Sequence, residues 1–264
     1  MKQVMGIITL ISDWGTRDYY VAAVKGMIYR FHPKAKIVDI THQIEHFNST
    51  EAAYVLKNAA RSFPDNTIHI IGINTEESLN NVHVVALYNN QYFIGTDDGI
   101  FSLIFDHKPE KIVVLDIPLE SSNHTFSSRD RFAKAATHLS LGGKIEELGP
   151  EKLELESKML FNPVIQEDTL KGMITYIDSY HNLVTNITRS NFKSFIKGSS
   201  FEISFRNRKY KVTEIHGSYG DVRPGEIVAL FTCNDILEIA INKGKAASLL
   251  GIDKNDPIAI ARHA

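Results

Sequence analysis

The chain has 264 residues, 43% hydrophobic and 23% charged, which is the composition of an ordinary globular protein with room for one large domain or two smaller ones. Its formal net charge of -2 gives no electrostatic reason to expect nucleic acid or a membrane as a partner, and no apolar run approaches membrane-spanning length. The single cysteine, Cys233, excludes an internal disulfide and is typical of a reducing compartment, so a cytoplasmic protein is expected.

The first half of the chain alternates strand and helix patterns. Residues 4–11 form an apolar run that predicts a strand, and apolar positions within residues 20–28 recur at helical spacing. Asn48 and Glu51 have the spacing of a capping box and predict a second helix that runs towards Phe63. Further strands are expected at 36–41, 67–73, 82–88, 91–96 and 111–115, with a hairpin turn at 89–90, and further helices at 100–105 and 129–141.

The second half has a different pattern. Periodicity fades over residues 149–169, which predict a linker. Beyond it, short strands are expected at 173–178, 183–187, 201–206, 210–215, 227–231 and 236–241, and one small helix at 243–250. This pattern favours a β-rich domain, either a small barrel or a sandwich. The predicted fold class is therefore α/β: an N-terminal α/β domain with a central, mostly parallel sheet (residues 1–160), followed by a smaller C-terminal domain (residues 170–264).

The most informative stretch is the turn at residues 12–18, between the first predicted strand and helix. Asp13 and Gly15 lie at the carboxyl end of that strand, where α/β sheets usually bind their ligands. The Asp13 carboxylate is well placed to accept hydrogen bonds from two hydroxyls, as from a ribose, and the glycine lets the backbone approach a ligand. The alternative is that Asp13 only caps the next helix.

The eleven histidines do not indicate a metal site. None of them falls in a His-Glu-x-x-His pattern, so no metal is expected. His42 and His69 lie near or within predicted strands, where we expect packed polar side chains.

Several separated stretches also share their order and spacing with one known family. They lie at residues 13–18, 25–26, 38–42, 97–99, 126–130, 177–187 and 237–247. Together they resemble the S-adenosylmethionine hydroxide adenosyltransferases and the related fluorinases and chlorinases. The resemblance implies a C-terminal β-barrel and a homotrimer, with each ligand between the N-terminal domain of one chain and the C-terminal domain of its neighbour. It also implies S-adenosylmethionine as substrate, without a separate cofactor.

The resemblance assigns ligand roles in the N-terminal half to two residues. Asp13 would hold the ribose hydroxyls of the adenosyl group, and Phe47 would lie against the adenosine. The alternative for Phe47 is a hydrophobic staple just before the helix cap at Asn48.

The resemblance assigns further ligand roles in the C-terminal half. Asp178 and Asn182, with Tyr180 between them, would reach the methionine and adenine parts; the alternative for Asp178 and Asn182 is a simple β-turn. The family has Phe-Gly where this chain has Tyr180 and His181, so a glycine-specific backbone conformation there would be strained by the histidine. Asn242 and Lys243 would meet the methionine carboxylate, although Lys243 also stands at the expected start of the last helix.

The positions that activate water in family hydrolases depart from the family pattern. The resemblance expects an Asp–Arg–His set, but this chain has Asn74, neutral residues at 80 and 81, and Ser127. Asparagine cannot accept a proton and serine is a poor base at neutral pH, so the usual base is missing. Glu76 or Glu77, after Asn74 and Thr75, is either a relocated general base or a solvated loop residue.

Ser128 raises the question of halogenation. It resembles the serine that donates to the halide in family halogenases, but a carboxylate from the loop at 74–77 would repel a bare halide. We therefore expect Asn74, Thr75, Glu77, Ser127 and Ser128 to surround the reacting atoms of a hydrolase. It would cleave S-adenosylmethionine to adenosine and methionine using water. The alternative is a catalytically degenerate protein that binds or senses an adenosyl ligand.

Overall fold

The structure is a computed structural model that describes residues 6–76, 81–118, 125–159, 161–205 and 210–263. The chain divides into two compact units, Met1–Met159 and Leu160–Ala264. Among the described residues, no helix combines the length and the hydropathy of a membrane span.

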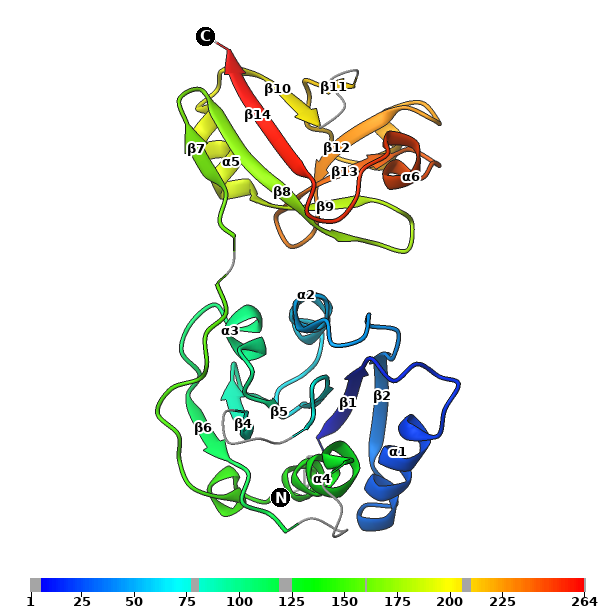
Figure 1. Cartoon of the computed structure of the whole chain (residues 1–264), viewed down its shortest axis with the longest axis vertical. Helices are drawn as coiled ribbons and strands as arrows, with labels where there is room; N and C mark the ends of the chain where they lie inside the picture. Colours follow the sequence, from blue (N-terminus) through cyan, green and yellow to red (C-terminus); the bar gives the residue numbers. More distant parts are fainter. Residues whose placement is uncertain (1–5, 77–80, 119–124, 160, 206–209, 264) are drawn as a thin grey trace. The chain divides into compact units, whose positions relative to one another are not determined.

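The N-terminal unit is built on a six-stranded sheet of order β2-β1-β3-β5-β4-β6 (Figure 1). The strands are β1 (Ile7–Ser12), β2 (Lys36–Thr41), β3 (Ile68–Gly72), β4 (His83–Tyr88), β5 (Gln91–Thr96) and β6 (Lys111–Val114). Neighbouring strands pair in parallel from β2 to β5, whereas β4 is antiparallel to both β5 and β6. The predicted mostly parallel sheet is therefore confirmed.

Helices cover both faces of this sheet. They are α1 (Tyr20–Phe31), α2 (Ser49–Ala60), α3 (Ile100–Ile104) and α4 (Ala133–Ser140), with a π-helical turn η1 (Ser128–Phe132) before α4 and a 3-10 turn η2 (Ile145–Leu148) after it. Alternate side chains of β1 enter opposite cores: Leu10 packs with α1 and α4, and Ile11 packs with α2 and α3. Figure 1 shows the two helix layers on either side of the sheet.

The strand order reverses between β1 and β3. The chain leaves β1 through α1 to reach β2 on one side, and returns through α2 to reach β3 on the other side of β1. In open α/β sheets the ligand crevice lies at such a switch point, outside the carboxyl ends of the strands. The fold therefore predicts a ligand site beside the residues that follow β1 and β3.

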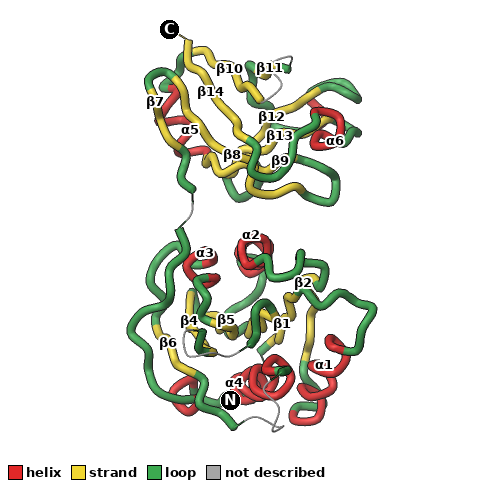
Figure 2. Tube along the Cα trace, viewed as in Figure 1, coloured by secondary structure: helices red, strands yellow, loops and turns green. Residues whose placement is uncertain are grey.

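The C-terminal unit is an eight-stranded antiparallel sheet of order β11-β10-β14-β8-β9-β13-β12, with β7 paired to β8 (Figure 2). Its elements are β7 (Val164–Gln166), β8 (Thr169–Ile177), β9 (Leu183–Thr188), α5 (Arg189–Ile196), β10 (Ser200–Phe205), β11 (Lys211–Val212), η3 (Tyr219–Asp221), β12 (Ile227–Phe231), β13 (Ile236–Ile241), α6 (Ala246–Leu250) and β14 (Pro257–His263). The sheet curls into a nearly closed barrel around one apolar core. The barrel expectation is confirmed over the sandwich.

Most predicted elements are present with shifted ends. Asn89 and Asn90 both have left-handed φ values, 49° and 59°, and they join β4 to β5 as the hairpin prediction required. The strand expected at 210–215 shortens to β11, and the last helix begins at Ala246 rather than Lys243. The second helix ends at Ala60 and does not reach Phe63.

Candidate functional site

Polar side chains gather where three neighbouring parallel strands end. Asp13 follows β1, Asn74 stands two residues after β3, and Asp97 and Asp98 follow β5. Since β1, β3 and β5 are adjacent in the sheet, their carboxyl ends place these residues along one edge. That edge includes the switch point, so it is the candidate ligand site of the N-terminal unit.

Asp13 is buried and holds a neighbouring loop. The residue is only 8% exposed, and its Oδ2 accepts a hydrogen bond from the backbone N–H of Phe47 at 2.9 Å. Helix α1 begins only at Tyr20 and has Tyr19 as its N-cap, so the interpretation of Asp13 as a helix cap is wrong. Gly15 has a left-handed φ of 65°, which suits glycine in the tight turn after the strand.

A chain of polar contacts, from buried Ser12 and His42 to the more exposed Asp39 and Lys25, supports the same turn. Ser12 Oγ lies 2.7 Å from Nδ1 of His42, and Nε2 of His42 lies 3.2 Å from Asp39, which also pairs with Lys25 at 2.5 Å. Burial raises the pKa of Asp39, but hydrogen bonds from Lys25 and His42 outweigh it and lower the pKa overall. The ring of Trp14 stacks on His42. His42 is thus a packed polar residue, as expected.

His69 is the second histidine expected to be packed. It is fully buried and lies 2.7 Å from Thr9 Oγ1 and 3.2 Å from Gln91 Oε1. Burial lowers the pKa of His69 to about 4, so the ring is neutral at physiological pH. This expectation is also confirmed.

Phe47 presents an exposed ring in a strained backbone conformation. Its φ is 64° and the residue is 76% exposed. Asn48 caps α2 as predicted, because its Oδ1 accepts from the N–H of Glu51 at 3.0 Å. A staple would need Phe47 to pack on the helix, so that interpretation is wrong. A left-handed aromatic residue costs on the order of 1–3 kcal/mol, and the bond to Asp13 helps to hold it.

Asn74 lies in a closed network with a carboxylate. Its Nδ2 donates to Oδ2 of Asp98 at 2.9 Å and to Oγ of Ser49 at 3.1 Å, while Ser49 Oγ donates to the same Asp98 oxygen at 2.9 Å. Lys158 pairs with that oxygen at 3.2 Å, and the N–H of Ile100 donates to the other oxygen of Asp98 at 3.1 Å. Burial raises the pKa of Asp98, but bonds from Asn74, Ser49 and Lys158 outweigh it and lower the pKa. Residues 97–99 belong to the stretches that resemble the family, but no role of Asp98 was predicted from the sequence.

The loop after Asn74 is anchored by its backbone. The carbonyl of Thr75 accepts from Nε2 of His83 at 3.1 Å, and Nδ1 of that buried histidine accepts from Nη1 of Arg131 at 3.1 Å. The next residue, Glu76, is exposed, which fits a solvated loop residue better than a relocated base. Glu77 lies outside the described residues.

The two serines lie at the start of the π-helical turn η1. Ser127 is 2% exposed and Ser128 is 0% exposed. Among the described residues, none forms a hydrogen bond with Ser128 Oγ. The turn packs against β3, and π-helical turns inside helices occur frequently at functional sites. The position where the resemblance predicted a histidine is therefore occupied by a buried neutral hydroxyl, that of Ser127.

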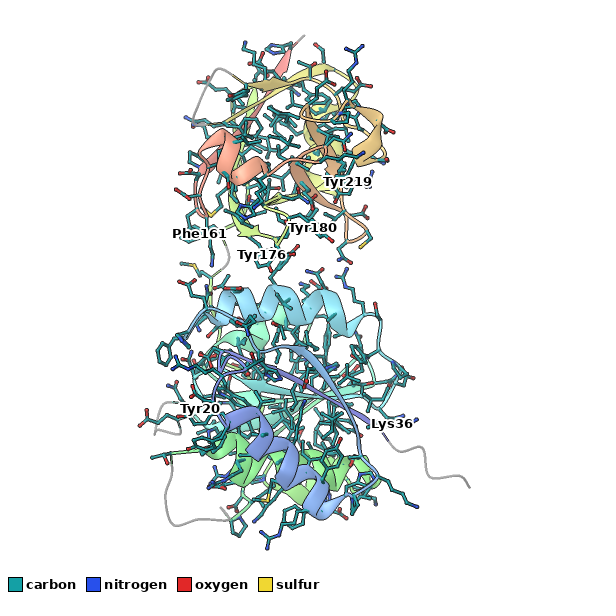
Figure 3. The ribbon with its side chains drawn as sticks, turned by 90° about the vertical axis from the view of Figure 1, so that its right-hand side faces the viewer. Tyr20, Lys36, Phe161, Tyr176, Tyr180 and Tyr219 are labelled. Atoms are coloured by element: carbon teal, nitrogen blue, oxygen red, sulfur yellow. The ribbon has the colours of Figure 1, made fainter. Side chains whose placement is uncertain are left out.

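In the C-terminal unit, Asp178 organises the turn after β8. Its Oδ1 accepts from the backbone N–H groups of Tyr180 at 2.9 Å and Asn182 at 2.8 Å, and its Oδ2 accepts from Asn182 Nδ2 at 3.1 Å. Asp178 and Asn182 thus form a turn, and the same two side chains stay the predicted ligand residues of this unit. Tyr180 is 76% exposed (Figure 3), so its ring is available to a ligand or a second chain.

His181 occupies a left-handed conformation in the same turn, with φ of 64°. The sequence predicted that histidine would be strained there if the position required a glycine-like backbone, and this is confirmed. Its carbonyl accepts from the N–H of Ala247 at 2.9 Å, and its Nδ1 lies 2.9 Å from Ser248 Oγ. These bonds tie the turn to α6.

Asn242 and Lys243 lie between β13 and α6. Asn242 Nδ2 donates to the carbonyl of Val222 at 2.7 Å, so this amide braces a loop. Lys243 is exposed with a left-handed φ of 54°. Because α6 begins at Ala246 with Lys245 as its N-cap, the interpretation of Lys243 as a helix start is wrong.

A hydrogen-bonded pair in the barrel, Glu238 with Tyr219, was not predicted from the sequence. Glu238 on β13 is 4% exposed, and its Oε1 accepts from the hydroxyl of Tyr219 at 2.8 Å. Burial and the nearby charge of Asp178 raise the pKa of Glu238, and burial with the Glu238 contact raises the pKa of Tyr219. The sequence feature that could have indicated this pair is a glutamate inside the otherwise apolar strand at 236–241.

Within the described ranges, no three His, Cys, Asp or Glu side chains gather as metal ligands would.

An α/β unit with carboxylate and amide side chains at its switch point, followed by a small antiparallel barrel, defines a two-domain class of protein. Family models for the N-terminal and C-terminal domains of SAM hydroxide adenosyltransferases match residues 8–149 and 172–259 respectively. The chain belongs to the SAM hydroxide adenosyltransferase family, and the resemblance seen in the sequence is confirmed.

Relatives within this family carry two kinds of name. The chain is 27% identical to an (R)-S-adenosyl-L-methionine hydrolase from Thermus thermophilus, covering 96% of this chain and 98% of that one. It is 28% identical to a protein of the same name from Methanocaldococcus jannaschii, covering 97% and 96%. A fluorinase from Actinopolyspora mzabensis is 26% identical over 71% of this chain and 73% of its own.

A solved structure shares the whole architecture. An uncharacterized conserved protein from Thermotoga maritima superposes with a TM-score of 0.89 at 28% identity, covering 97% of this chain and all 100% of that one.

Proposed function

We propose that this protein hydrolyses S-adenosylmethionine to adenosine and L-methionine. The main support is that Asp13 and Asn74 follow the carboxyl ends of β1 and β3, at the switch point of the sheet. Relatives named (R)-S-adenosyl-L-methionine hydrolase match 96% or more of the chain, whereas the fluorinase matches 71%. The near-complete match favours water over halide as the nucleophile.

The reaction is a displacement at the 5′ carbon of the adenosyl group. The oxygen of water bonds to that carbon, the carbon–sulfur bond breaks with its electron pair going to sulfur, methionine leaves, and one proton is released. The sulfonium makes the substrate reactive, so the protein mainly has to align water and exclude bulk solvent. No separate cofactor is needed for this step.

Each site residue has a role in this proposal. Asp13 holds the ribose hydroxyls and Phe47 stacks on the adenosine. Asn74, flanked by Thr75, accepts a hydrogen bond from the water without taking its proton, because an amide is not a base. Ser127 and Ser128 line the same region with neutral hydroxyl groups.

The barrel residues complete the binding of the substrate in this proposal. Asp178, Tyr180 and Asn182 meet the methionine and adenine parts, and Asn242 and Lys243 meet the methionine carboxylate. These residues and Asp13 lie in different compact units. We propose that three copies of the chain form a homotrimer in which neighbouring chains share each site.

A second candidate is an adenosyl-ligand binding protein without turnover. The neutral side chains of Asn74 and Ser127 favour it, because neither can take a proton from water. Incubation of the pure protein with S-adenosylmethionine, followed by chromatography, separates the two candidates. Adenosine and methionine in equal amounts support the hydrolase. Saturable binding without product contradicts it, and a halogenated adenosine formed in fluoride or chloride indicates a halogenase.

A further inference from the structure

The amide of Asn74 is held in a defined orientation by its neighbours. Its Nδ2 donates to Asp98 Oδ2 at 2.9 Å and to Ser49 Oγ at 3.1 Å. The Asp98 side chain is only 12% exposed, so water competes little for this contact. The three side chains come from separate elements: Ser49 begins α2, Asn74 follows β3 and Asp98 follows β5.

The chemistry of these groups dictates which end of the amide faces Asp98. Hydrogen bonds lower the pKa of Asp98, so its carboxylate is ionised and can only accept. Ser49 directs its own hydrogen to Asp98 Oδ2, which leaves a lone pair of Ser49 Oγ to accept from Asn74. Both neighbours therefore require the NH₂ group of Asn74, and its carbonyl oxygen Oδ1 points away from Asp98.

We propose that Asp98 is a positioning residue for the reaction: it fixes the Asn74 amide so that Oδ1 is presented as the hydrogen-bond acceptor for the attacking water. The inference rests on the proposed function and adds to it the residue that decides how water is held. Asp98 itself is not the base, because both its oxygens are engaged by Asn74, Ser49, Lys158 and Ile100.

A purely structural role for Asp98 makes a different prediction. Its Oδ1 accepts from the N–H of Ile100 at the start of α3, and an asparagine at 98 would keep that acceptor. The Nδ2 of that asparagine would then face Nδ2 of Asn74, so two donors would meet and the Asn74 amide would turn over. If Asp98 only caps α3, Asp98→Asn leaves turnover unchanged. If it positions Asn74, turnover falls although the fold survives.

Exchanging the two side chains provides a rescue. In the double variant Asn74→Asp/Asp98→Asn, the amide at 98 donates to the carboxylate at 74, so the contact is restored and acceptor oxygens again face the water. Asn74 has a φ of 50°, a conformation that aspartate also tolerates. Asn74→Asp alone places two carboxylates in contact, which raises the pKa of the pair.

The test measures kcat, KM and thermal unfolding for wild type, Asp98→Asn, Asn74→Asp, the double variant and the control Asp106→Asn, whose carboxylate is 62% exposed beside Lys57. We expect Asp98→Asn to lower kcat by about tenfold to a hundredfold with KM nearly unchanged. The double variant should recover at least the wild-type kcat, and the control should behave as wild type. Wild-type kcat in Asp98→Asn, or no recovery in the double variant, overturns the inference.

Two further outcomes are decisive. If Asp98→Asn does not fold, the double variant must turn over faster than Asn74→Asp at neutral pH, and equal or slower turnover overturns the inference. If the wild type itself releases no adenosine, the proposed function fails and this inference fails with it. An active wild type with an unaffected Asp98→Asn variant overturns the positioning role alone.

Discussion

The carboxylate of Asp13 accepts a hydrogen bond from the backbone N–H of Phe47 at 2.9 Å, and so joins the end of β1 to the loop that begins α2. One partner is buried and the other exposes its ring, at 8% and 76% exposure. A ligand that occupies the switch point would meet the carboxylate and the aromatic ring together. Substituting each residue alone separates their contributions to binding.

Replacing Asp13 should weaken the binding of adenosine. Asp13→Ala removes a charge-assisted hydrogen bond to ribose, worth roughly 1.5–3 kcal/mol, so we expect the Kd to rise by about one to two orders of magnitude. Asp13→Asn keeps an acceptor for the Phe47 N–H and should show a smaller loss. Isothermal titration calorimetry measures both, with Asp18→Ala, an exposed residue of the same turn, as control. Wild-type affinity in a folded Asp13→Ala variant contradicts the ribose assignment.

Phe47→Ala should reduce the affinity for adenosine without reducing stability. Stacking of an aromatic ring on a base is worth about 1–3 kcal/mol, whereas an exposed ring contributes little to the fold. Calorimetry gives the affinity and urea unfolding gives the stability. A large loss of stability with unchanged affinity would show that the ring packs on α2 instead.

Gly72→Ala should destabilise the N-terminal unit, and Gly26→Ala should not. A Cβ at Gly72, the last residue of β3, would lie 2.4 Å from the Trp14 ring, and such overpacking costs about 1–3 kcal/mol. A Cβ at Gly26 within α1 meets nothing within 4 Å, and alanine in a helix is favoured over glycine by about 1 kcal/mol. Thermal unfolding should therefore shift down for one variant and up for the other. Equal shifts would contradict the packing of Trp14 under the ligand turn.

Glu238 should make stability fall as pH rises above the ordinary range of a carboxyl group. Burial raises the pKa of Glu238 in the folded state most strongly, and the negative charge of Asp178 raises it further. Its contribution is therefore fully present below the unfolded pKa and is lost as pH rises through the folded pKa. Glu238→Gln keeps an acceptor for Tyr219 and should flatten this dependence. Urea midpoints across pH for wild type, Glu238→Gln and the exposed control Glu214→Gln check it; parallel curves for wild type and Glu238→Gln would contradict the raised pKa.

Local sequence patterns were enough to predict most of the helices and strands. An apolar run predicted the first strand, and Asn89 with Asn90 predicted the hairpin because both residues tolerate the left-handed turn conformation. Helix α5 (Arg189–Ile196) escaped notice because only Phe192, Phe195 and Ile196 are buried in a short polar stretch. Strand β14 (Pro257–His263) was also missed, although it alternates around buried Ile258 and Ile260.

The contacts that organise the candidate site could not be predicted in the same way. Asp13 and Phe47 are 34 positions apart, and Asn74 and Asp98 are 24 apart, so each contact depends on strand order rather than on local pattern. The sequence showed that Asn74 stands where the resemblance predicts a base. The structure adds that an ionised carboxylate lies directly against it, which no spacing rule would have shown.

Incubation with S-adenosylmethionine in water enriched in oxygen-18 shows whether water displaces methionine at the 5′ carbon. We predict that mass spectrometry will find adenosine with the heavy isotope in its 5′ hydroxyl, beside unlabelled methionine. Saturable binding of S-adenosylmethionine with no adenosine released, or a product in which the 5′ carbon carries a halogen, would contradict displacement by water.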